Sequence, residues 1–131
     1  MKANIAIFEY LDLIRSTHPR RITDVEWAIA SNIRRPTIPE LRGRALSIRK
    51  GGKPVGRPCT VEKLTLLFTG LQKIIGGDQL RKKILEIADG EKNLTTRMIL
   101  LAMLASERVD PETIQHLEQT LRLAIKNTFD K

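Results

Sequence analysis

The chain has 131 residues, 41% of them hydrophobic and 29% charged, so it can bury a core of its own and is not disordered throughout. Its 23 Lys and Arg against 15 Asp and Glu give a net charge of +8, which is typical of small proteins that bind nucleic acid, anionic membrane surfaces or acidic proteins. The single cysteine, Cys59, excludes an intrachain disulfide and a thiolate-rich metal site, and nothing indicates an oxidising compartment.

Apolar residues at helical spacing predict two helices near the start of the chain. The first covers about residues 4–17. Its apolar stripe consists of Ile7, Phe8, Leu11 and Ile14. The second is short and covers 24–30, after Thr23 and Asp24, whose side chains favour N-cap positions.

Two further helices are separated by a stretch rich in glycine and proline. The third helix begins among residues 34–37 and runs to about Leu46. Residues 47–59 contain three Gly and two Pro and are therefore expected to form a loop or short wing. Thr60 caps a fourth helix, which Gly76-Gly77 ends. Its predicted inward residues are Val61, Leu64, Leu67, Phe68 and Leu71.

The C-terminal part of the chain predicts three amphipathic helices over about 78–88, 95–105 and 110–127. The first carries Leu80, Ile84 and Ile87, and the last is striped by Ile114, Leu117, Leu121 and Ile125. No alternating strand pattern competes, so the expected fold class is all-α. These helices either complete the core of one bundle or form a dimer interface.

Charge is distributed unequally along the chain. The first sixty residues hold 12 basic and 5 acidic side chains, a net charge of +7, whereas the rest hold 11 and 10, a net charge of +1. Residues 34–57 alone hold eight basic side chains against one acid, Glu40. Such a run can be a solvated loop that only keeps the protein soluble, or the electrostatic footprint of a nucleic-acid site.

Residues 22–43 have the pattern of a short helix, a tight turn and a second helix. Ala28 is small where two helices cross closely, and Trp27 beside it supplies bulk. Asn32 falls at the turn, where a residue that tolerates a left-handed backbone is needed. Ile33 is expected to be a buried plug, followed by an inner face of Ile38 and Leu41. The same residues also suit ordinary core positions of a helical bundle.

This pattern resembles the lambda-repressor-like, or XRE/Cro, helix-turn-helix family of bacterial and phage regulators. The resemblance covers about residues 5–75, and the helix that starts Thr60-Val61-Glu62-Lys63-Leu64 is similar to the fourth helix of that family. It implies a helix-turn-helix DNA-binding domain in residues 1–77. Residues 78–131, which resemble no family, are then a helical region that serves dimerisation.

Two features of residues 32–40 differ from the family pattern. Asn32 replaces the usual turn glycine, a change that the left-handed conformation tolerates. Pro36 and Pro39 are suited only to a first helical turn, because proline lacks an N–H donor and clashes with a preceding turn. Thr37 to Glu40 has the pattern of a capping box with Pro39 in its first turn. The third helix is therefore expected to start at Ile38, with residues 34–36 extended.

The resemblance implies that the N-terminal end of the third helix enters the major groove. The candidates for base contact are Arg34, Arg35, Thr37, Glu40 and Arg44. Arg35 is the first choice, because Arg can bind guanine with two hydrogen bonds, while for Glu40 the capping role is favoured. The candidates for phosphate contact are Arg20, Arg21, Arg42, Arg49, Lys50, Lys53 and Arg57.

The loop contains two fragments of known ligand motifs. Gly56-Arg57-Pro58 matches part of the AT-hook pattern, which lays Arg into a minor groove, but Val55 stands where its first Arg belongs. A flexible loop that contacts phosphate is therefore the favoured interpretation. Gly51-Gly52-Lys53 lacks the remaining glycine and the Ser or Thr of a nucleotide P-loop, so ATP is not expected.

No spacing in the chain indicates catalysis, a metal or a cofactor. His18 and His116 have no repeated ligand spacing, and two His with one Cys make a weak case for zinc. Cys59 precedes a helix N-terminus, which can lower a thiol pKa, but it has no recognisable His partner and is interpreted as structural. We expect a protein that is not an enzyme and has no cofactor.

The sequence thus predicts a sequence-specific DNA-binding transcriptional regulator of the prophage-repressor type. Its expected partners are double-stranded DNA and a second copy, bound through the C-terminal helices and chiefly residues 110–127. The alternative is a helical protein-interaction or adaptor module, such as an antitoxin-like partner, that does not read DNA. Glu9 and Asp12 do not suit a secretory signal, and the longest apolar run, 98–105, is too short to span a bilayer, so a cytoplasmic protein away from membranes is expected.

Overall fold

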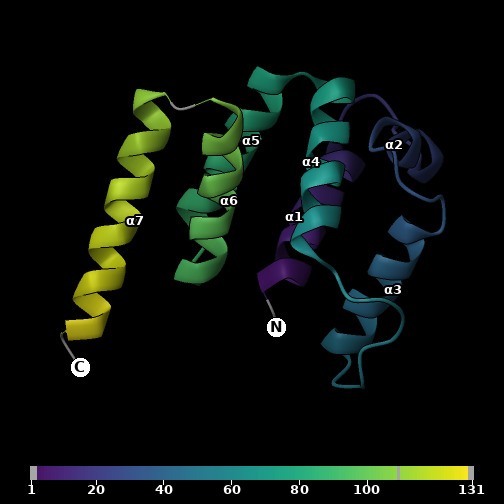
Figure 1. Ribbon diagram of the computed structural model, residues 1–131, viewed down its shortest axis with the longest axis horizontal. Coiled ribbons are helices and arrows are strands. Elements are labelled where there is room, and N and C mark those ends of the chain that lie inside the picture. The colour runs from purple at the N-terminus through teal and green to yellow at the C-terminus, as the bar shows by residue number, and fades with distance from the viewer. Residues whose placement is uncertain (1–2, 109, 130–131) are drawn as a thin grey trace. The chain divides into compact units, whose positions relative to one another are not determined.

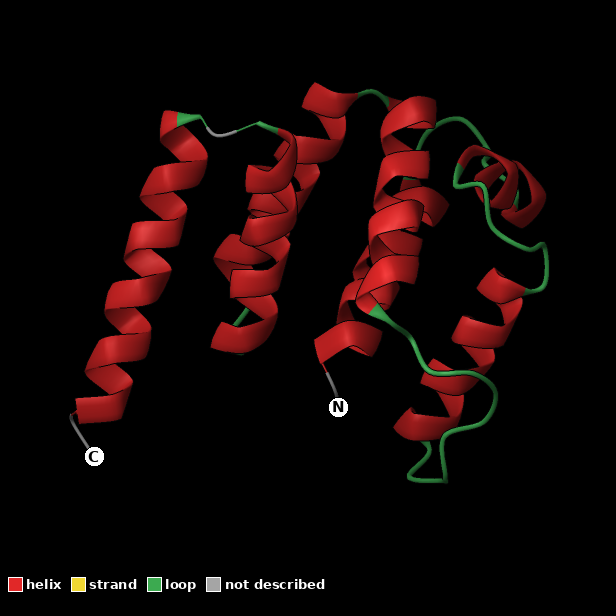
Figure 2. Ribbon diagram, in the orientation of Figure 1, coloured by secondary structure: helices red, strands yellow, loops and turns green. Residues whose placement is uncertain are grey.

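The computed structural model describes residues 3–108 and 110–129 and confirms the all-α class, since this part of the chain holds seven helices and no strand (Figure 1; Figure 2). The helices are α1 (Ala3–Thr17), α2 (Asp24–Ala30), α3 (Thr37–Arg49), α4 (Val61–Ile75), α5 (Gly77–Gly90), α6 (Leu94–Glu107) and α7 (Pro111–Phe129). They form two compact parts, here called the N-terminal unit, through Leu80, and the C-terminal unit, from Arg81. The division falls within α5, whereas the sequence pattern places it after residue 77.

The core of the N-terminal unit forms around Trp27 of α2, which is fully buried. Its ring stacks on Phe8 of α1 with the centroids 6.2 Å apart. Its indole N–H donates a 3.0 Å hydrogen bond to the Leu67 carbonyl of α4. The stripes predicted for α1 and α4 are confirmed by the burial of Ile7, Phe8, Leu11, Ile14, Leu64, Leu67, Phe68 and Leu71.

Val61 was predicted to point inward, and this is wrong. It is the first residue of α4, directly after the cap, and its side chain is 63% exposed. The apolar pattern of the sequence therefore starts at Val61, before the part of α4 that packs against the core.

Threonine caps fix where α2 and α4 begin, as predicted. The side-chain oxygens of Thr23 and Thr60 accept hydrogen bonds from the backbone N–H groups of Glu26 and Lys63. α4 ends at Gly76, whose φ of +102° lies in a region that only glycine adopts easily.

α3 differs from its predicted bounds at both ends. It begins at Thr37 rather than Ile38, and it runs to Arg49 rather than to about Leu46, so the following loop is shorter than predicted. Helical propensity in residues 47–49 continues the helix until Gly51, which has a φ of +77°.

The predicted capping box at Thr37 is also wrong. Pro36 occupies the N-cap position, and the helix has no side-chain cap there. The segment before it is a turn rather than extended, because the Thr37 N–H donates to the Arg34 carbonyl at 3.1 Å and Pro36 has helical backbone angles. Pro39 lies in the first turn of α3, where proline is tolerated.

The C-terminal unit consists of most of α5 with α6 and α7. Its apolar core contains Ile84, Leu85, Ala88, Leu100, Leu101 and Leu104. Arg81 joins the three helices, since its guanidinium donates hydrogen bonds to Thr113 Oγ1 of α7 at 2.6 Å and to the Arg108 carbonyl after α6 at 3.0 Å. Asp110, which pairs with Arg81, accepts from the Thr113 N–H and so caps α7.

Candidate nucleic-acid interface

The connection between α2 and α3 has the tight geometry that its sequence suggests. Asn32 adopts a φ of +54°, as predicted for the turn residue. The Ile33 N–H then donates to the Ala28 carbonyl at 3.1 Å. Ala28, Ile38 and Leu41 are fully or almost fully buried, which confirms the predicted inner face. Ile33 is half-buried, so its predicted role as a buried plug is wrong, since the turn leaves one side of it in solvent.

The end of α2 packs on α4 at a contact that requires glycine. A Cβ on Gly70 would lie 2.0 Å from Ser31 Oγ and 2.8 Å from the Ser31 nitrogen. Any side chain at Gly70 would therefore push α2 away from α4. Gly70 is not among the residues predicted to matter from the sequence, although a glycine in the middle of an apolar helix is itself a signal of close approach.

An ion-pair network ties α3 to α1 and α2. Arg42 of α3 donates to both oxygens of Asp12 on α1 at 3.0 Å and to both oxygens of Asp24 on α2 at 2.8 and 2.9 Å. The guanidinium holds the pKa of Asp24 below its usual range, and the two carboxylates raise the pKa of Arg42. Arg42, predicted to contact phosphate, thus has its donors directed at protein carboxylates.

A second arginine supports the same network. Arg15 donates to Asp12 at 3.0 Å and to the Ile22 carbonyl at 2.7 Å. Its guanidinium carbon also lies 5.9 Å from the centre of the Trp27 ring, within range of a cation–π interaction. The placement of α3 is therefore linked to the buried core of the unit.

The base-contact candidates fall into two groups. Arg34, Arg35 and Glu40 are exposed around the N-terminal end of α3, and Thr37 is half-buried there. Arg44 lies one turn further along the helix and is turned toward the loop, where Nη1 donates to the carbonyls of Val55 and Gly56 at 3.4 and 3.1 Å. The Glu40 side chain makes no hydrogen bond or ion pair within the described residues, so the capping role predicted for it is wrong.

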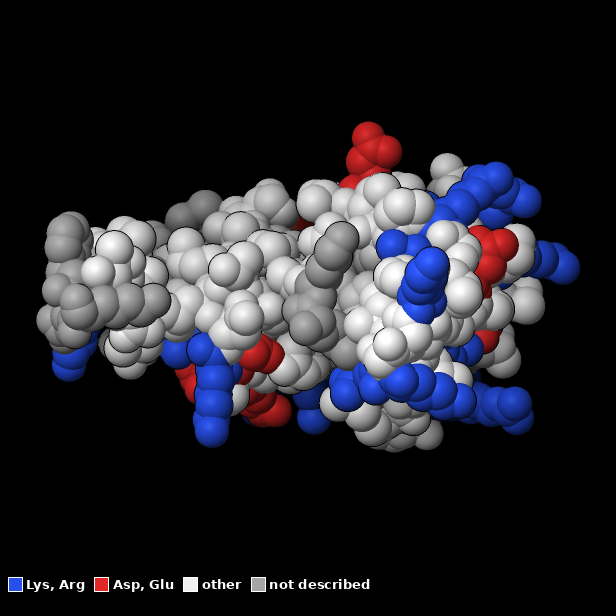
Figure 3. Space-filling view, turned by 90° about the horizontal axis from the view of Figure 1, so that it is seen from below, with Lys and Arg blue, Asp and Glu red and all other residues white. Residues whose placement is uncertain are grey.

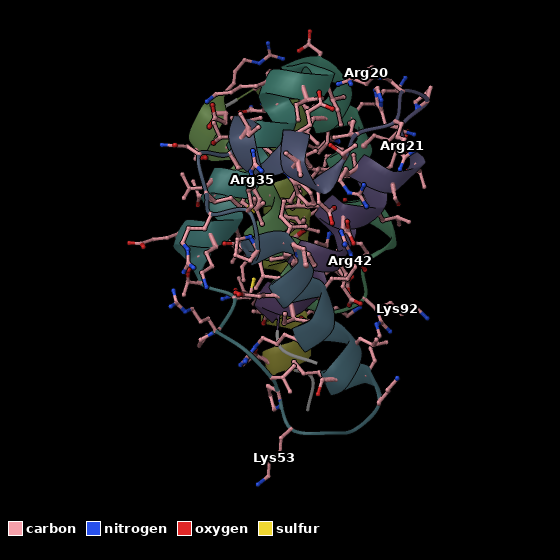
Figure 4. The ribbon with its side chains drawn as sticks, turned by 90° about the vertical axis from the view of Figure 1, so that its right-hand side faces the viewer. Arg20, Arg21, Arg35, Arg42, Lys53 and Lys92 are labelled. Carbon is pink, nitrogen blue, oxygen red and sulfur yellow. The ribbon has the colours of Figure 1, made fainter. Side chains whose placement is uncertain are left out.

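Residues 50–60, here called the 50–60 loop, are anchored along their whole length. Besides Arg44, three side chains donate hydrogen bonds to backbone carbonyls of the loop. Ser47 Oγ donates to Lys53 at 2.6 Å, Lys63 Nζ to Pro58 at 2.9 Å and Asn4 Nδ2 to Cys59 at 2.9 Å. Lys53 points away from the helices at the tip of the loop, and Arg35 lies near the opposite end of α3 (Figure 4). These hydrogen bonds hold the backbone of the loop in place, and its cationic side chains project from that backbone.

Several predicted phosphate contacts are already paired with acids. Arg20 makes two hydrogen bonds to Glu26, at 2.8 and 3.1 Å, and Arg49 makes two to Glu9, at 2.6 and 2.9 Å. Of the candidates, those that are exposed and have no carboxylate partner within the described residues are Arg21, Arg34, Arg35, Lys50, Lys53 and Arg57. Figure 3 shows Lys and Arg side chains projecting from the surface of the N-terminal unit, with few acidic side chains among them.

Five of the six unpaired cations form two sets at the two ends of α3. Arg34 and Arg35 directly precede the helix, and Lys50, Lys53 and Arg57 belong to the loop that follows it, whereas Arg21 lies between α1 and α2. α3 has 13 residues, which at 1.5 Å each separate its ends by about 20 Å. This separation exceeds the major-groove width of about 12 Å, so the two sets can reach phosphates on both sides of a groove.

Cys59 is buried, and desolvation raises its pKa to about 11, which makes it a poor nucleophile. Within residues 3–108 and 110–129, no cluster of three or more His, Cys, Asp or Glu is arranged to hold a metal, and no helix is long and apolar enough to cross a membrane.

No protein-family model, curated protein or solved structure matches the chain.

Proposed function

We propose that the chain is a sequence-specific DNA-binding transcriptional regulator of the prophage-repressor type, and that it binds its site as a homodimer through the C-terminal helices. In this proposal α2 and α3 form the helix-turn-helix of a lambda-repressor-like domain. The N-terminal end of α3 enters the major groove, and the 50–60 loop contacts the flanking backbone.

The observation that carries the proposal is the selective pairing of the cations. Arg15, Arg20, Arg42 and Arg49 are paired with Asp12, Asp24, Glu9 or Glu26, whereas five cations in the segments that directly precede and follow α3 have no carboxylate partner within the described residues. Free cations retain their full attraction for phosphate, because no intramolecular ion pair must be broken first. The charge of this unit is thus concentrated where α3 and the loop can meet DNA together.

Arg35 is the residue that we assign to base recognition. It is exposed in the turn directly before α3, and its guanidinium can donate two parallel hydrogen bonds to the O6 and N7 of guanine. Lys53 and Arg57, on the loop, are assigned to phosphate, which fixes the position of the protein without reading sequence.

A second candidate function is a protein-interaction or adaptor module, such as an antitoxin-like partner. It is favoured by the exposed apolar side chains of Val25 and Ile29 on α2, which line a shallow groove with Ile74. A protein partner could cover this groove, and DNA contact would not.

Selection of random duplex DNA against the purified chain tests the first function. We expect an enriched, two-fold symmetric sequence. Arg35→Ala should reduce the discrimination between this sequence and a scrambled duplex by about 1–3 kcal/mol. Lys53→Ala should weaken both duplexes equally, and Lys92→Ala, which removes the same charge from the C-terminal unit, is the matched control. Absence of enrichment, with weak binding that is lost at moderate salt, would reject DNA reading and favour the adaptor.

A further inference from the structure

α7 exposes an apolar stripe while it buries polar residues. Ile114, Leu121 and Ile125 are 40%, 53% and 49% exposed. Thr113 and Thr120, by contrast, are completely buried. Each threonine directly precedes a residue of the stripe, so the buried face and the stripe are about 100° apart around the helix. Packing within the C-terminal unit therefore leaves the apolar stripe of α7 unused.

The charges along α7 divide at the middle of this stripe. Glu112 and Glu118 lie in the N-terminal half, and Arg122 and Lys126 lie in the C-terminal half. Charges of this order at helix ends suit the helix dipole, but that effect is limited to the first and last turns. Glu118 and Arg122 lie in the middle of a 19-residue helix, so the dipole does not explain their order.

Self-complementarity explains both the stripe and the charges. If a second α7 is laid antiparallel across the stripe, with the two-fold axis between residues 119 and 120, Ile114 faces Ile125 of the second copy. Glu118 then lies beside Arg122 of the second copy, and the symmetry repeats this pair. A parallel arrangement would instead set Glu118 level with Glu118 and Arg122 level with Arg122 on opposite sides of the seam, so that neither charge would have the opposite charge of the second copy at its own level.

We propose that a second copy of this chain docks on α7 in antiparallel orientation, with Ile114, Leu121 and Ile125 as its apolar seam and Glu118 and Arg122 as its reciprocal ion pairs. This inference rests on the homodimer of the proposed function and does not depend on DNA reading. The interface is isologous, so it closes at two copies.

Charge reversal tests the pairing in DNA-free protein by sedimentation velocity. We expect Glu118→Arg and Arg122→Glu each to weaken self-association at least tenfold, because each creates two like-charge contacts. An equimolar mixture of the two variants should dimerise again, and so should the doubly reversed chain. Gln119→Arg, which adds charge at an exposed position away from the stripe, is the control, and circular dichroism confirms that each variant is folded.

Disulfide trapping tests the orientation in a Cys59→Ser background. Residues 114 of two antiparallel copies would be about 16 Å apart along the helix axis, too far for a disulfide, whereas residues 114 and 125 would meet. Ile114→Cys and Ile125→Cys should therefore cross-link when mixed and not when oxidised alone. Cross-linking of either variant alone would overturn the antiparallel orientation.

Two other results would overturn the proposal, and each separates it from DNA reading. A chain that is monomeric at about 100 µM while it still selects a DNA sequence would reject the α7 interface and leave the DNA site in place. A dimer that is unaffected by either charge reversal would show that another surface pairs. Loss of sequence selection alone, with the dimer and its charge dependence intact, would reject DNA reading and leave the α7 interface in place.

Discussion

Arg42 and Asp24 form a two-armed ion pair that joins the middle of α3 to the first residue of α2, with Nη1 2.8 Å from Oδ2 and Nη2 2.9 Å from Oδ1. The same guanidinium holds Asp12 of α1, so one side chain is shared by three helices. Planar guanidinium geometry suits such two-armed contacts, which fix orientation as well as distance. Arg42 therefore helps set the angle at which α3 leaves the α2 turn.

The first prediction concerns the energy of this pair. Arg42→Ala should lower the free energy of unfolding by about 1–2 kcal/mol, a modest value because its side chain is 40% exposed and solvent screens the charges. A double-mutant cycle with Asp24→Asn, measured by urea denaturation, should give a favourable coupling. Arg20→Ala, which breaks the exposed pair with Glu26, should leave the urea midpoint unchanged. Equal losses for Arg42→Ala and Arg20→Ala would contradict a structural role for Arg42.

The second prediction concerns pH. Hydrogen bonding from Arg42 holds the pKa of Asp24 below its ordinary value of 3.8. The unfolded chain then binds this proton more readily than the folded chain, so the contribution of Asp24 to stability is present above about pH 4 and is lost as the pH falls through the folded pKa. Asp24→Asn should be less stable than the wild type at pH 7, and the difference should shrink toward pH 3. If the difference between the urea midpoints of the two proteins stayed constant from pH 7 to pH 3, this linkage of Asp24 to stability would be rejected.

The third prediction concerns the contact of α2 with α4. Gly70→Ala should destabilise the chain by about 1–3 kcal/mol, because its Cβ would meet the Ser31 backbone and α2 would have to move. Gly43→Ala is the matched control, since nothing lies within 4 Å of its Cβ in α3. In that helix, alanine should raise the free energy of unfolding by about 0.5–1 kcal/mol. Thermal denaturation of both variants checks the opposite signs, and a neutral Gly70→Ala would show that the helices do not approach so closely.

Local patterns allowed much of the fold to be predicted. The apolar stripes of α1 and α4, the caps at Thr23 and Thr60 and the left-handed turn at Asn32 depend on residues within a few positions of each other. The start of α3 was misplaced because Thr37-Ile38-Pro39-Glu40 has the composition of a capping box, whereas the turn from Arg34 brings the chain into the helix before Thr37 can act as the cap.

The distribution of roles among the cations could not be predicted, because it depends on contacts between distant residues. Arg42 pairs with acids 18 and 30 positions away, and Arg49 pairs with Glu9, 40 positions away. In the sequence these arginines belong to the same basic run as Lys53 and Arg57. The two groups differ only in the folded chain, where some arginines pair with acids and position α3 while other cations have no carboxylate partner within the described residues.

The last prediction separates anchoring of the 50–60 loop from base reading. Arg44 was a candidate for base contact, but its Nη1 binds the carbonyls of Val55 and Gly56. Arg44→Met keeps the length of the side chain and removes these donors, so we expect faster amide hydrogen exchange in the loop and weaker binding to every duplex alike. If the five unpaired cations other than Arg35 all meet phosphate, log K should fall against log salt with a slope of about −4.5.

Removing Lys53 and Arg57 together provides the comparison. Each phosphate contact contributes about 0.9 to the salt dependence, so this double alanine variant should reduce the steepness of the slope by about 2. Arg44→Met should reduce it less, because Lys53 and Arg57 remain and can still reach phosphate from a loop that must first be ordered. Fluorescence anisotropy at several salt concentrations measures both. If Arg44→Met changed the preferred DNA sequence, as is expected for Arg35→Ala, this result would indicate that Arg44 contacts the bases. It would reject the role of Arg44 as a loop anchor.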